Sequence, residues 1–133
     1  MAKSAKLKWA DEPAEHDYPA AASYLRLLTR PDSAEALAGL MAKATTVQHP
    51  VKDILRAARL PLLAADNPEV AKDLKKVRDG IALSPILLVR GDLDSGRALQ
   101  IADGYHRVCA GYHLSENTQI PCRLVDALPG IAG

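Results

Sequence analysis

The sequence predicts an α+β domain, a small sheet with helices between its strands, preceded by a helical hairpin. Two consecutive helical patterns occupy residues 19–44. Residues 84–103 hold two strand-like segments joined by a short turn, which indicates a β-hairpin. A helical pattern and a β-favouring segment then follow within residues 104–128. Helices interspersed with short strands in this way indicate a mixed α and β fold.

Composition and charge exclude several classes of protein. Of the 133 residues, 48% are hydrophobic, which is ordinary for a soluble domain. A formal net charge of +1 argues against a general nucleic-acid-binding surface, and direct sequence-specific DNA binding is not expected. Two cysteines form neither a disulfide framework nor a zinc motif. Because the start of the chain has no apolar run and no stretch approaches the roughly 18 apolar residues of a membrane span, we expect a cytoplasmic protein without a membrane segment.

The first 46 residues are predicted to form an extension that ends in the helical hairpin. Residues 1–18 are polar, and we expect them to be extended, with Trp9 and Tyr18 attaching them to the body of the protein. The segments 19–30 and 32–44 are predicted to be helices. Their signals are Pro19 in a first turn, Pro31 as a stop, Asp32 or Ser33 as a cap, and the apolar stripe of Leu37, Leu40 and Met41.

The middle of the chain combines an extended segment with helices. Residues 45–51 are β-branched and extended, and residues 51–60 read as a short helix or a turn-rich segment. The segment 68–80 is a helix with clear boundaries. Its signals are Asn67 as N-cap, Pro68 at the first position, Gly80 at the end, an inward face of Val70, Leu74 and Val77, and an outward or sideways face of Lys72, Lys75, Lys76 and Arg78.

The C-terminal part is predicted to be a hairpin, a helix and a closing strand. The run 84–91 is continuously apolar and indicates a buried strand, with 97–103 as its partner. Residues 104–114 then form a helix of about three turns. The segment 120–128 opens as a strand before a tail rich in Pro and Gly.

Five residues with chemical potential stand where a predicted strand meets a predicted helix: Asp103, Gly104, Tyr105, His106 and Arg107. The first N–H groups of a helix have no partner within the helix and, with the helix dipole, favour an anion. Glycine allows close approach to the backbone, arginine offers two donors to phosphate oxygens, and histidine adds a donor. Asp103 can orient His106 or Arg107, or help to hold a metal ion on a nucleotide. The pattern therefore predicts a phosphate or nucleotide site.

The same residues also have structural interpretations. Asp103 and Gly104 form a turn sequence in which the aspartate caps the helix. Arg107 can pair with Asp103 or with Glu116, and a single histidine in a helix is more often a surface or core residue than a functional one. From the residues alone, both interpretations stay open.

A longer comparison adds a family resemblance. The segments SPILLVRG, RALQIADGYHRVCAGYHL and NTQIPCRLV, in this order, resemble the ParB/sulfiredoxin-like superfamily. Its members share a Pro-Ile opening strand, a hairpin, a Gly-x-His-Arg or Gly-Glu-Arg-Arg turn, an alanine-bearing helix and a closing Ile-Pro strand. The resemblance covers about residues 66–126. It implies that residues 47–133 form a ParB/sulfiredoxin-like domain with a small mixed sheet, and that residues 1–46 are an extension outside it.

The site residues of the family carry over only in part. In sulfiredoxins the turn is Gly-Gly-Cys-His-Arg, with a catalytic cysteine and a His-Arg pair that binds ATP phosphates. This chain keeps Gly104, His106 and Arg107 but has Tyr105 in place of the cysteine. A phenol cannot replace a thiolate, and Cys109 is expected to pack inward, so sulfiredoxin activity is not expected. In ParB proteins the box is Gly-Glu-Arg-Arg and binds CTP; here only Arg107 follows the glycine unchanged, and no helix-turn-helix is expected after it.

A third branch, ParB-like small kinases and nucleases, resembles the Asp-Gly-x-x-Arg form of the turn. The resemblance implies that Asp103 and Arg107 lie beside the nucleotide. Sulfiredoxins place hydroxyls toward ATP on the preceding helix, where this chain offers Lys72 and Lys76. The kinases also need an upstream acidic base, and the candidates are Asp53, Asp66 and Glu69.

Two functions from different classes follow. The leading hypothesis is a protein that binds a phosphate-bearing small molecule such as ATP or CTP with Mg²⁺; as an enzyme it would be a kinase-like phosphotransferase or a nucleotide hydrolase. No catalytic residue and no metal-binding cluster of side chains is assigned. The alternative is a non-enzymatic interaction or DNA-partition accessory protein that keeps the fold without catalysis. In that case residues 19–44 bind a protein partner or a second copy, through Leu25, Leu28, Leu37 and Met41.

Overall fold

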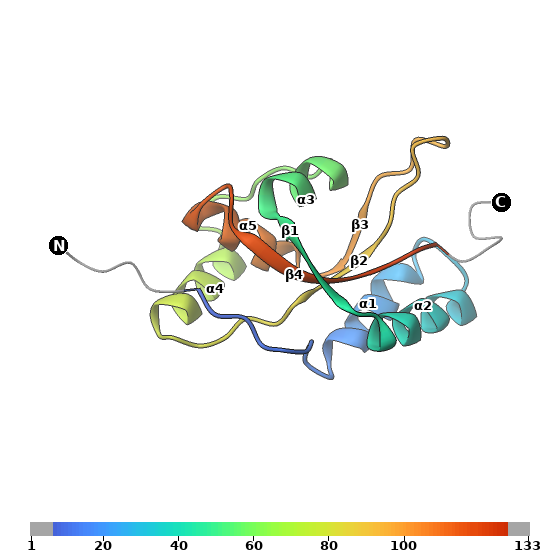
Figure 1. Cartoon of the computed structure of the whole chain (residues 1–133), viewed down its shortest axis with the longest axis horizontal. Coiled ribbons are helices and arrows are strands. Elements are labelled where there is room, and N and C mark those ends of the chain that lie inside the picture. Colours follow the sequence, from blue (N-terminus) through green and yellow to red (C-terminus); the bar gives the residue numbers. More distant parts are fainter. Residues whose placement is uncertain (1–6, 128–133) are drawn as a thin grey trace.

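The computed structural model describes residues 7–127 of the chain. Helices are interspersed with short strands, which agrees with the predicted α+β class (Figure 1). Within the described residues, every helix is too short or too polar to cross a membrane. The elements are α1 (Asp17–Leu25), α2 (Pro31–Lys43), β1 (Thr46–Pro50), α3 (Val51–Ala58), α4 (Pro68–Arg78), β2 (Ile86–Val89), β3 (Gln100–Asp103), α5 (Tyr105–Leu114) and β4 (Gln119–Val125).

The four strands form one mixed sheet in the order β1-β4-β2-β3. β4 pairs in antiparallel fashion with β1 and in parallel with β2, and β3 is the antiparallel partner of β2. The predicted hairpin is confirmed, since Leu88 of β2 lies opposite Ile101 of β3. α5 carries the chain from the edge strand β3 to β4, and this crossover places the start of α5 directly after the end of β3.

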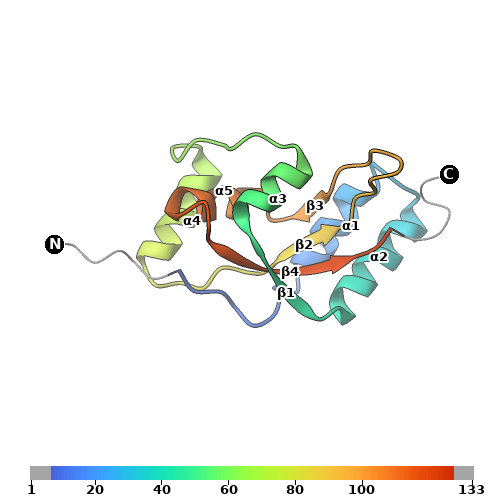
Figure 2. The ribbon, with the colours of Figure 1, turned by 45° about the horizontal axis from the view of Figure 1, so that its top comes forward.

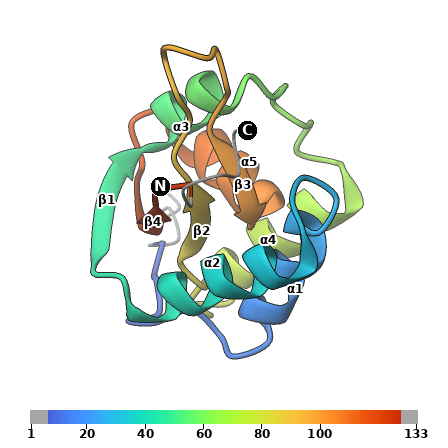
Figure 3. The same cartoon turned by 90° about the vertical axis from the view of Figure 1, so that its right-hand side faces the viewer.

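Helices cover both faces of the sheet (Figure 3). Leu87 and Val89 of β2 belong to a buried cluster with α1 and α2, on one face. Ile86 and Leu88 belong to a second buried cluster, shared with α3, α4 and α5, on the other face. Because β2 is buried on both sides, its sequence is continuously apolar instead of alternating.

The N-terminal segment is attached to the body through the two aromatic residues that the sequence indicated. Trp9 pairs with Leu83, where the Ala10 N–H donates to the Leu83 carbonyl at 2.8 Å and the Leu83 N–H donates to the Lys8 carbonyl at 2.9 Å (Figure 2). Trp9 packs against the cluster on the α3–α5 face, and Tyr18 against the cluster on the α1–α2 face. The extension is therefore bound to both halves of the core.

Two helices begin where their local signals predicted. The Asn67 side chain accepts hydrogen bonds from the N–H groups of Glu69 and Val70, at 3.0 and 3.2 Å, and Pro68 is the first residue of α4. α5 begins at Tyr105, one residue after the predicted start, because Gly104 is its N-cap. The Asn67 cap and the left-handed Gly104 each affect only the backbone of neighbouring residues, so the sequence could indicate where these helices start.

The boundary between the first two helices differs from the prediction. α1 ends at Leu25, well before Pro31, so the proline does not stop it. Pro31 is instead the first residue of α2, and the N-cap is Arg30 in an extended conformation, not Asp32 or Ser33. Proline suits this position because its missing N–H would have no partner there in any case.

The surface proposed for a partner on the helical hairpin is wrong for three of its four residues. Leu25, Leu37 and Met41 are buried in a cluster with residues of β2, β3 and β4, and Leu28 is exposed. The apolar stripes of α1 and α2 face the sheet of the same chain, which explains their pattern without a partner. The large apolar side chains that these helices and the turn after α1 expose are Tyr24, Leu27, Leu28 and Leu40.

Replacement of a central core residue should destabilise the whole chain. Leu87 is fully buried in β2, so Leu87→Ala should lower the free energy of unfolding by about 2–5 kcal/mol, because it leaves a cavity between two layers. The matched control is Leu93→Ala, since Leu93 is 99% exposed and its loss should change stability by less than about 0.5 kcal/mol. Urea unfolding followed by circular dichroism measures both; equal losses would contradict the assigned core.

Candidate functional site

Residues 103–107, called the corner below, lie where a strand meets a helix, as the sequence predicted. β3 ends at Asp103, Gly104 is the N-cap of α5, and α5 starts at Tyr105. Gly104 has φ 110°, in the left-handed region, where side chains other than hydrogen are strained. The glycine therefore lets the chain turn from strand to helix in one step.

Close packing is a second reason for this glycine. A Cβ at Gly104 would lie 2.5 Å from Cδ1 of Ile86 and 2.7 Å from Nη2 of Arg107. The protein's own side chains thus fill the space beside Gly104. Ile86 of β2 and the Arg107 guanidinium approach this glycine closely, whereas the sequence suggested that a ligand would do so.

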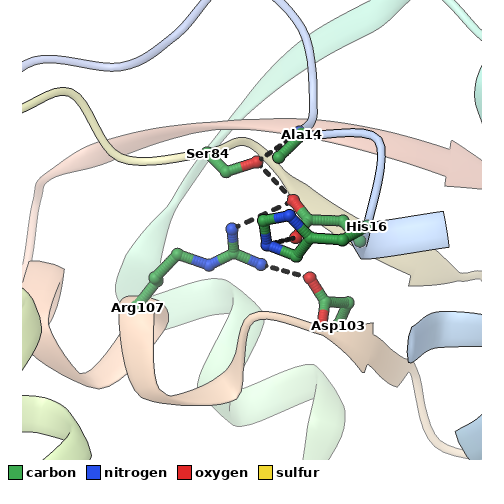
Figure 4. Close-up of polar contacts among 6 residues, drawn as sticks. Ala14, His16, Ser84, Asp103 and Arg107 are labelled. Carbon is green, nitrogen blue, oxygen red and sulfur yellow. Dashed lines mark hydrogen bonds and ion pairs between the residues drawn. The ribbon is translucent and has the colours of Figure 1, made fainter. Parts of the chain in front are cut away.

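Arg107 turns back toward the end of β3 and is held in an internal ion-pair network (Figure 4). Its Nη2 lies 2.5 Å from Oδ2 of Asp103, and its Nη1 lies 3.4 Å from Oδ2 of Asp17. Only 13% of the Arg107 side chain is exposed. Of the two structural partners considered from the sequence, Asp103 is the one found, while Glu116 lies beyond the other end of α5.

The second carboxylate of the network comes from the N-terminal extension. Asp17 is the first residue of α1, and its side chain is 6% exposed. The Ser84 hydroxyl donates a hydrogen bond to Asp17 Oδ2 and accepts one from the Ala14 N–H at 3.0 Å (Figure 4). The extension therefore covers the corner and contributes a charged group to it.

Sequence reasoning missed Asp17 and Ser84. Asp17 and Arg107 are separated by 90 positions, and Asp17 and Ser84 by 67. No motif spacing connects residues so far apart. The one available signal was an acidic residue two positions before a predicted helix, a pattern that usually reflects the helix dipole.

Burial perturbs the carboxyl groups around Arg107. Desolvation raises the pKa of Asp103; the Arg107 charge opposes this shift, and the Asp17 carboxylate adds to it. Desolvation likewise raises the pKa of Asp73 on α4, against the lowering effects of Lys76, Arg107 and His106. α4 and α5 pack together, and Asp73 is buried where the charges of both helices act on it. Perturbed carboxyl groups near a histidine are a feature of functional sites.

Tyr105 and His106 form the half-buried rim of the corner. The two rings lie 5.7 Å apart between centroids. The Tyr105 hydroxyl donates to the Pro61 carbonyl, and His113 contacts the Leu63 carbonyl at 2.7 Å. The connection between α3 and α4 is thereby held against α5, and the Tyr105 hydroxyl is engaged in that contact.

The structure does not bring the predicted lysines and the three candidate upstream acids together in one site. Lys72 and Lys76 are exposed on α4, and the Lys76 charge acts on Asp73. Among the three candidate bases, Glu69 acts on Asp73 from the first turn of α4, Asp66 is exposed in the preceding loop, and Asp53 pairs with Arg56 on α3. The acids that contact Arg107 are Asp17 and Asp103, and the Arg107 charge also acts on Asp73.

Neither cysteine is placed as a nucleophile. Cys109 packs inward, as expected, and Cys122 is also fully buried. Burial raises the pKa of Cys109, and it raises that of Cys122 to about 12, which keeps both as thiols near neutral pH. Within residues 7–127 no group of three or more His, Cys, Asp or Glu side chains could hold a metal ion.

Comparisons with protein-family models, with curated proteins and with solved structures find no match to this chain.

Removal of the guanidinium should be costly because it leaves two carboxylates without their partner. Arg107→Met should lower the free energy of unfolding by about 3–5 kcal/mol. The matched control is Arg26→Met, since the Arg26–Glu35 pair is on the surface and should contribute about 0–1 kcal/mol. A double-mutant cycle of Arg107→Met with Asp17→Asn measures the coupling directly. A coupling energy near zero would contradict the assigned network.

The stability of the chain should also depend on Asp73 in a pH-dependent way. A raised pKa in the folded state means that folding favours the protonated carboxyl, so stability falls as pH rises from about 3.8 through the folded pKa. Asp73→Asn removes this loss, and its stability relative to wild type should therefore increase as the pH rises above about 3.8. The control is Asp66→Asn at an exposed loop position. A difference that stays flat with pH in urea unfolding would refute the prediction.

Proposed function

We propose that the corner at the start of α5 binds an oxyanion, the phosphate of a nucleotide or of another small phosphorylated ligand. The observation that supports this proposal is the Asp17 carboxylate, which rests against the Arg107 guanidinium and the Ser84 hydroxyl. A carboxylate and a phosphate oxygen use the same donors. Asp17 thus occupies the position that a ligand oxyanion would take.

The proposal makes Asp17 a competitor for the ligand. Its Oδ2 lies 3.4 Å from Arg107 Nη1, whereas Asp103 is at 2.5 Å from Nη2. The longer contact is the weaker hydrogen bond, so a phosphate displaces Asp17 before it displaces Asp103. The N-terminal N–H groups of α5, which receive no side-chain cap from Gly104, add their partial positive charge.

A nucleotide is the ligand class that the surrounding residues support. His106 at the rim and Lys76 on α4 provide further donors toward phosphate oxygens. With ATP or CTP as ligand, Mg²⁺ would be held largely by the phosphates and by one or two carboxylates. Asp73 or Asp103 fits that role better than a dedicated metal site, because the described residues include no larger cluster of donor side chains.

Phosphoryl transfer or nucleotide hydrolysis is the reaction class that such a site would serve. These reactions depend mainly on positioning and on neutralisation of charge. Asp73 is the acid whose pKa is raised and on which the His106 charge acts, and a raised pKa suits proton transfer. We assign binding to the corner as the proposed function, and a reaction as its extension.

A second candidate is supported by the same network. Arg107 is already neutralised by two carboxylates, so it also serves as an anchor for the N-terminal extension. In that case the chain is an interaction protein, and the exposed Leu27, Leu28 and Leu40 are the surface to test.

Removal of the competing carboxylate discriminates between these functions. Asp17→Ala should be less stable than wild type in the absence of anions, and phosphate or ATP with Mg²⁺ should restore its stability. At 100 times the dissociation constant the gain is about 2.7 kcal/mol. Thermal shifts with phosphate, sulfate, ATP and CTP, with and without Mg²⁺, measure it.

The matched control is Asp32→Ala, which removes one negative charge from an exposed position of α2. Stronger binding to Asp17→Ala than to Asp32→Ala, abolished in Asp17→Ala combined with Arg107→Met, supports the anion site. Equal thermal shifts in the two single variants would contradict the anion site and would favour Arg107 as an anchor for the N-terminal extension.

A further inference from the structure

A pocket of about 550 Å³ lies away from the corner, between α3 and the β2–β3 hairpin. Its lining includes residues of α3, of both arms of the hairpin and of β4, and none of residues 103–107. Figures 1 and 3 show the hairpin projecting beyond the sheet on the side of α3. The volume is within the range of sites for small ligands, about 300–1,000 Å³.

The chemistry of the pocket is divided between an apolar floor and a basic rim. Ile54, Leu88 and Leu99 contribute apolar surface. Four arginines line the same space, against two aspartates. The charged residues are Arg56, Arg59, Arg90, Arg97, Asp53 and Asp92.

Three of the four arginines have partners within the chain. Arg56 pairs with Asp53 at 3.0 Å, and Arg90 pairs with Asp126 at 2.6 Å. Arg59 donates to the Gly96 carbonyl at 2.8 Å. These three side chains are therefore oriented at the rim by contacts that leave part of each guanidinium available.

Arg97 differs from the other three. Its Nε is buried and is the one buried side-chain nitrogen or oxygen atom in residues 7–127 without a hydrogen-bond partner. The backbone holds the residue in place, because the Asp92 N–H donates to the Arg97 carbonyl at 2.8 Å. A Cβ at Gly91 would lie 2.5 Å from that carbonyl, so the two backbone segments of the hairpin lie close together at this point. Buried polar groups normally have a partner, whereas the guanidinium of Arg97 lacks the internal contacts that hold the other three, and Arg97 lines the pocket.

We propose that this pocket binds a small organic anion, with an apolar or aromatic body on Ile54, Leu88 and Leu99 and a carboxylate, sulfonate or phosphate at Arg97. A guanidinium binds an oxyanion through two parallel N–H groups, and because Nε is buried the terminal Nη groups of Arg97 are the ones that a ligand in the pocket would contact. Arg59 and Arg56 lie at the same rim and reinforce the positive potential. The inference is independent of the proposed function at α5, because the two sites share no residue.

Two dyes of similar apolar body test the proposal. Anilinonaphthalene sulfonate carries an anionic group, and N-phenyl-1-naphthylamine has none. The anionic dye should bind the wild-type chain at least about tenfold more tightly than the neutral dye, a difference of 1.4 kcal/mol. Arg97→Gln should remove most of this difference while it leaves the neutral dye unchanged.

The controls separate the pocket from the corner and from misfolding. Arg26→Gln changes an exposed arginine of the turn after α1 and should leave both dyes unaffected. Arg59→Gln, at an exposed position, provides a second variant in case Arg97→Gln does not fold, and should weaken the anionic dye alone. Arg107→Met should not alter the binding of either dye in its folded fraction. If both dyes bind equally, or if Arg97→Gln and Arg59→Gln both bind the anionic dye as wild type does, the proposal is wrong.

Discussion

The ion pairs of Arg107 with Asp103 and Asp17 are the constraint that organises this protein. They join the end of β3, the first turn of α5 and the N-terminal extension, and Ser84 links the loop before β2 to the same carboxylate. Burial of these charges is costly unless each has a partner. The extension is consequently part of the same folded unit as the sheet, and α1 and α2 complete the core on one face.

This network also explains why the corner has two chemically related interpretations. A guanidinium that holds an aspartate is already an oxyanion site, occupied by the protein itself. Whether the occupant is permanent depends on the relative free energies of Asp17 and a ligand phosphate at Arg107. The geometry is asymmetric, with Asp103 in the close contact and Asp17 in the longer one, and this asymmetry allows the first carboxylate to position the guanidinium while the second yields its place.

The pocket beside the hairpin presents the opposite situation. At α5 the arginine has two carboxylates, whereas at the hairpin Arg97 has an unsatisfied Nε. The sequence motif of the strand-to-helix turn indicates Arg107, whereas the missing hydrogen-bond partner indicates Arg97. β3 connects the two sites. Arg97 lies three residues before its first residue, Gln100, and Asp103 is its last residue.

Local signals were sufficient for the elements whose causes lie within a few residues. The cap at Asn67, the turn at Gly104 and the continuous apolar run of β2 predicted α4, α5 and the central strand, since each acts through neighbouring backbone groups or through burial on both faces. Local signals also placed Asp103 at the end of a strand and Arg107, four positions later, in the first turn of the helix that follows. The ends of α1 and α2 were less predictable, because Pro31 is compatible with both the end of one helix and the beginning of the next.

Long-range placement depended on the folded chain. Leu37 and Met41 form the same apolar stripe whether it packs on the chain's own sheet or on a partner. Only the docking of α2 on the sheet shows that they belong to the core. Asp17 reaches Arg107 across 90 positions, and the pocket that Arg97 lines exists only once α3 and the hairpin meet. Charge pairing and hydrogen-bond satisfaction are properties of three-dimensional neighbours, and no spacing along the chain encodes them at such separations.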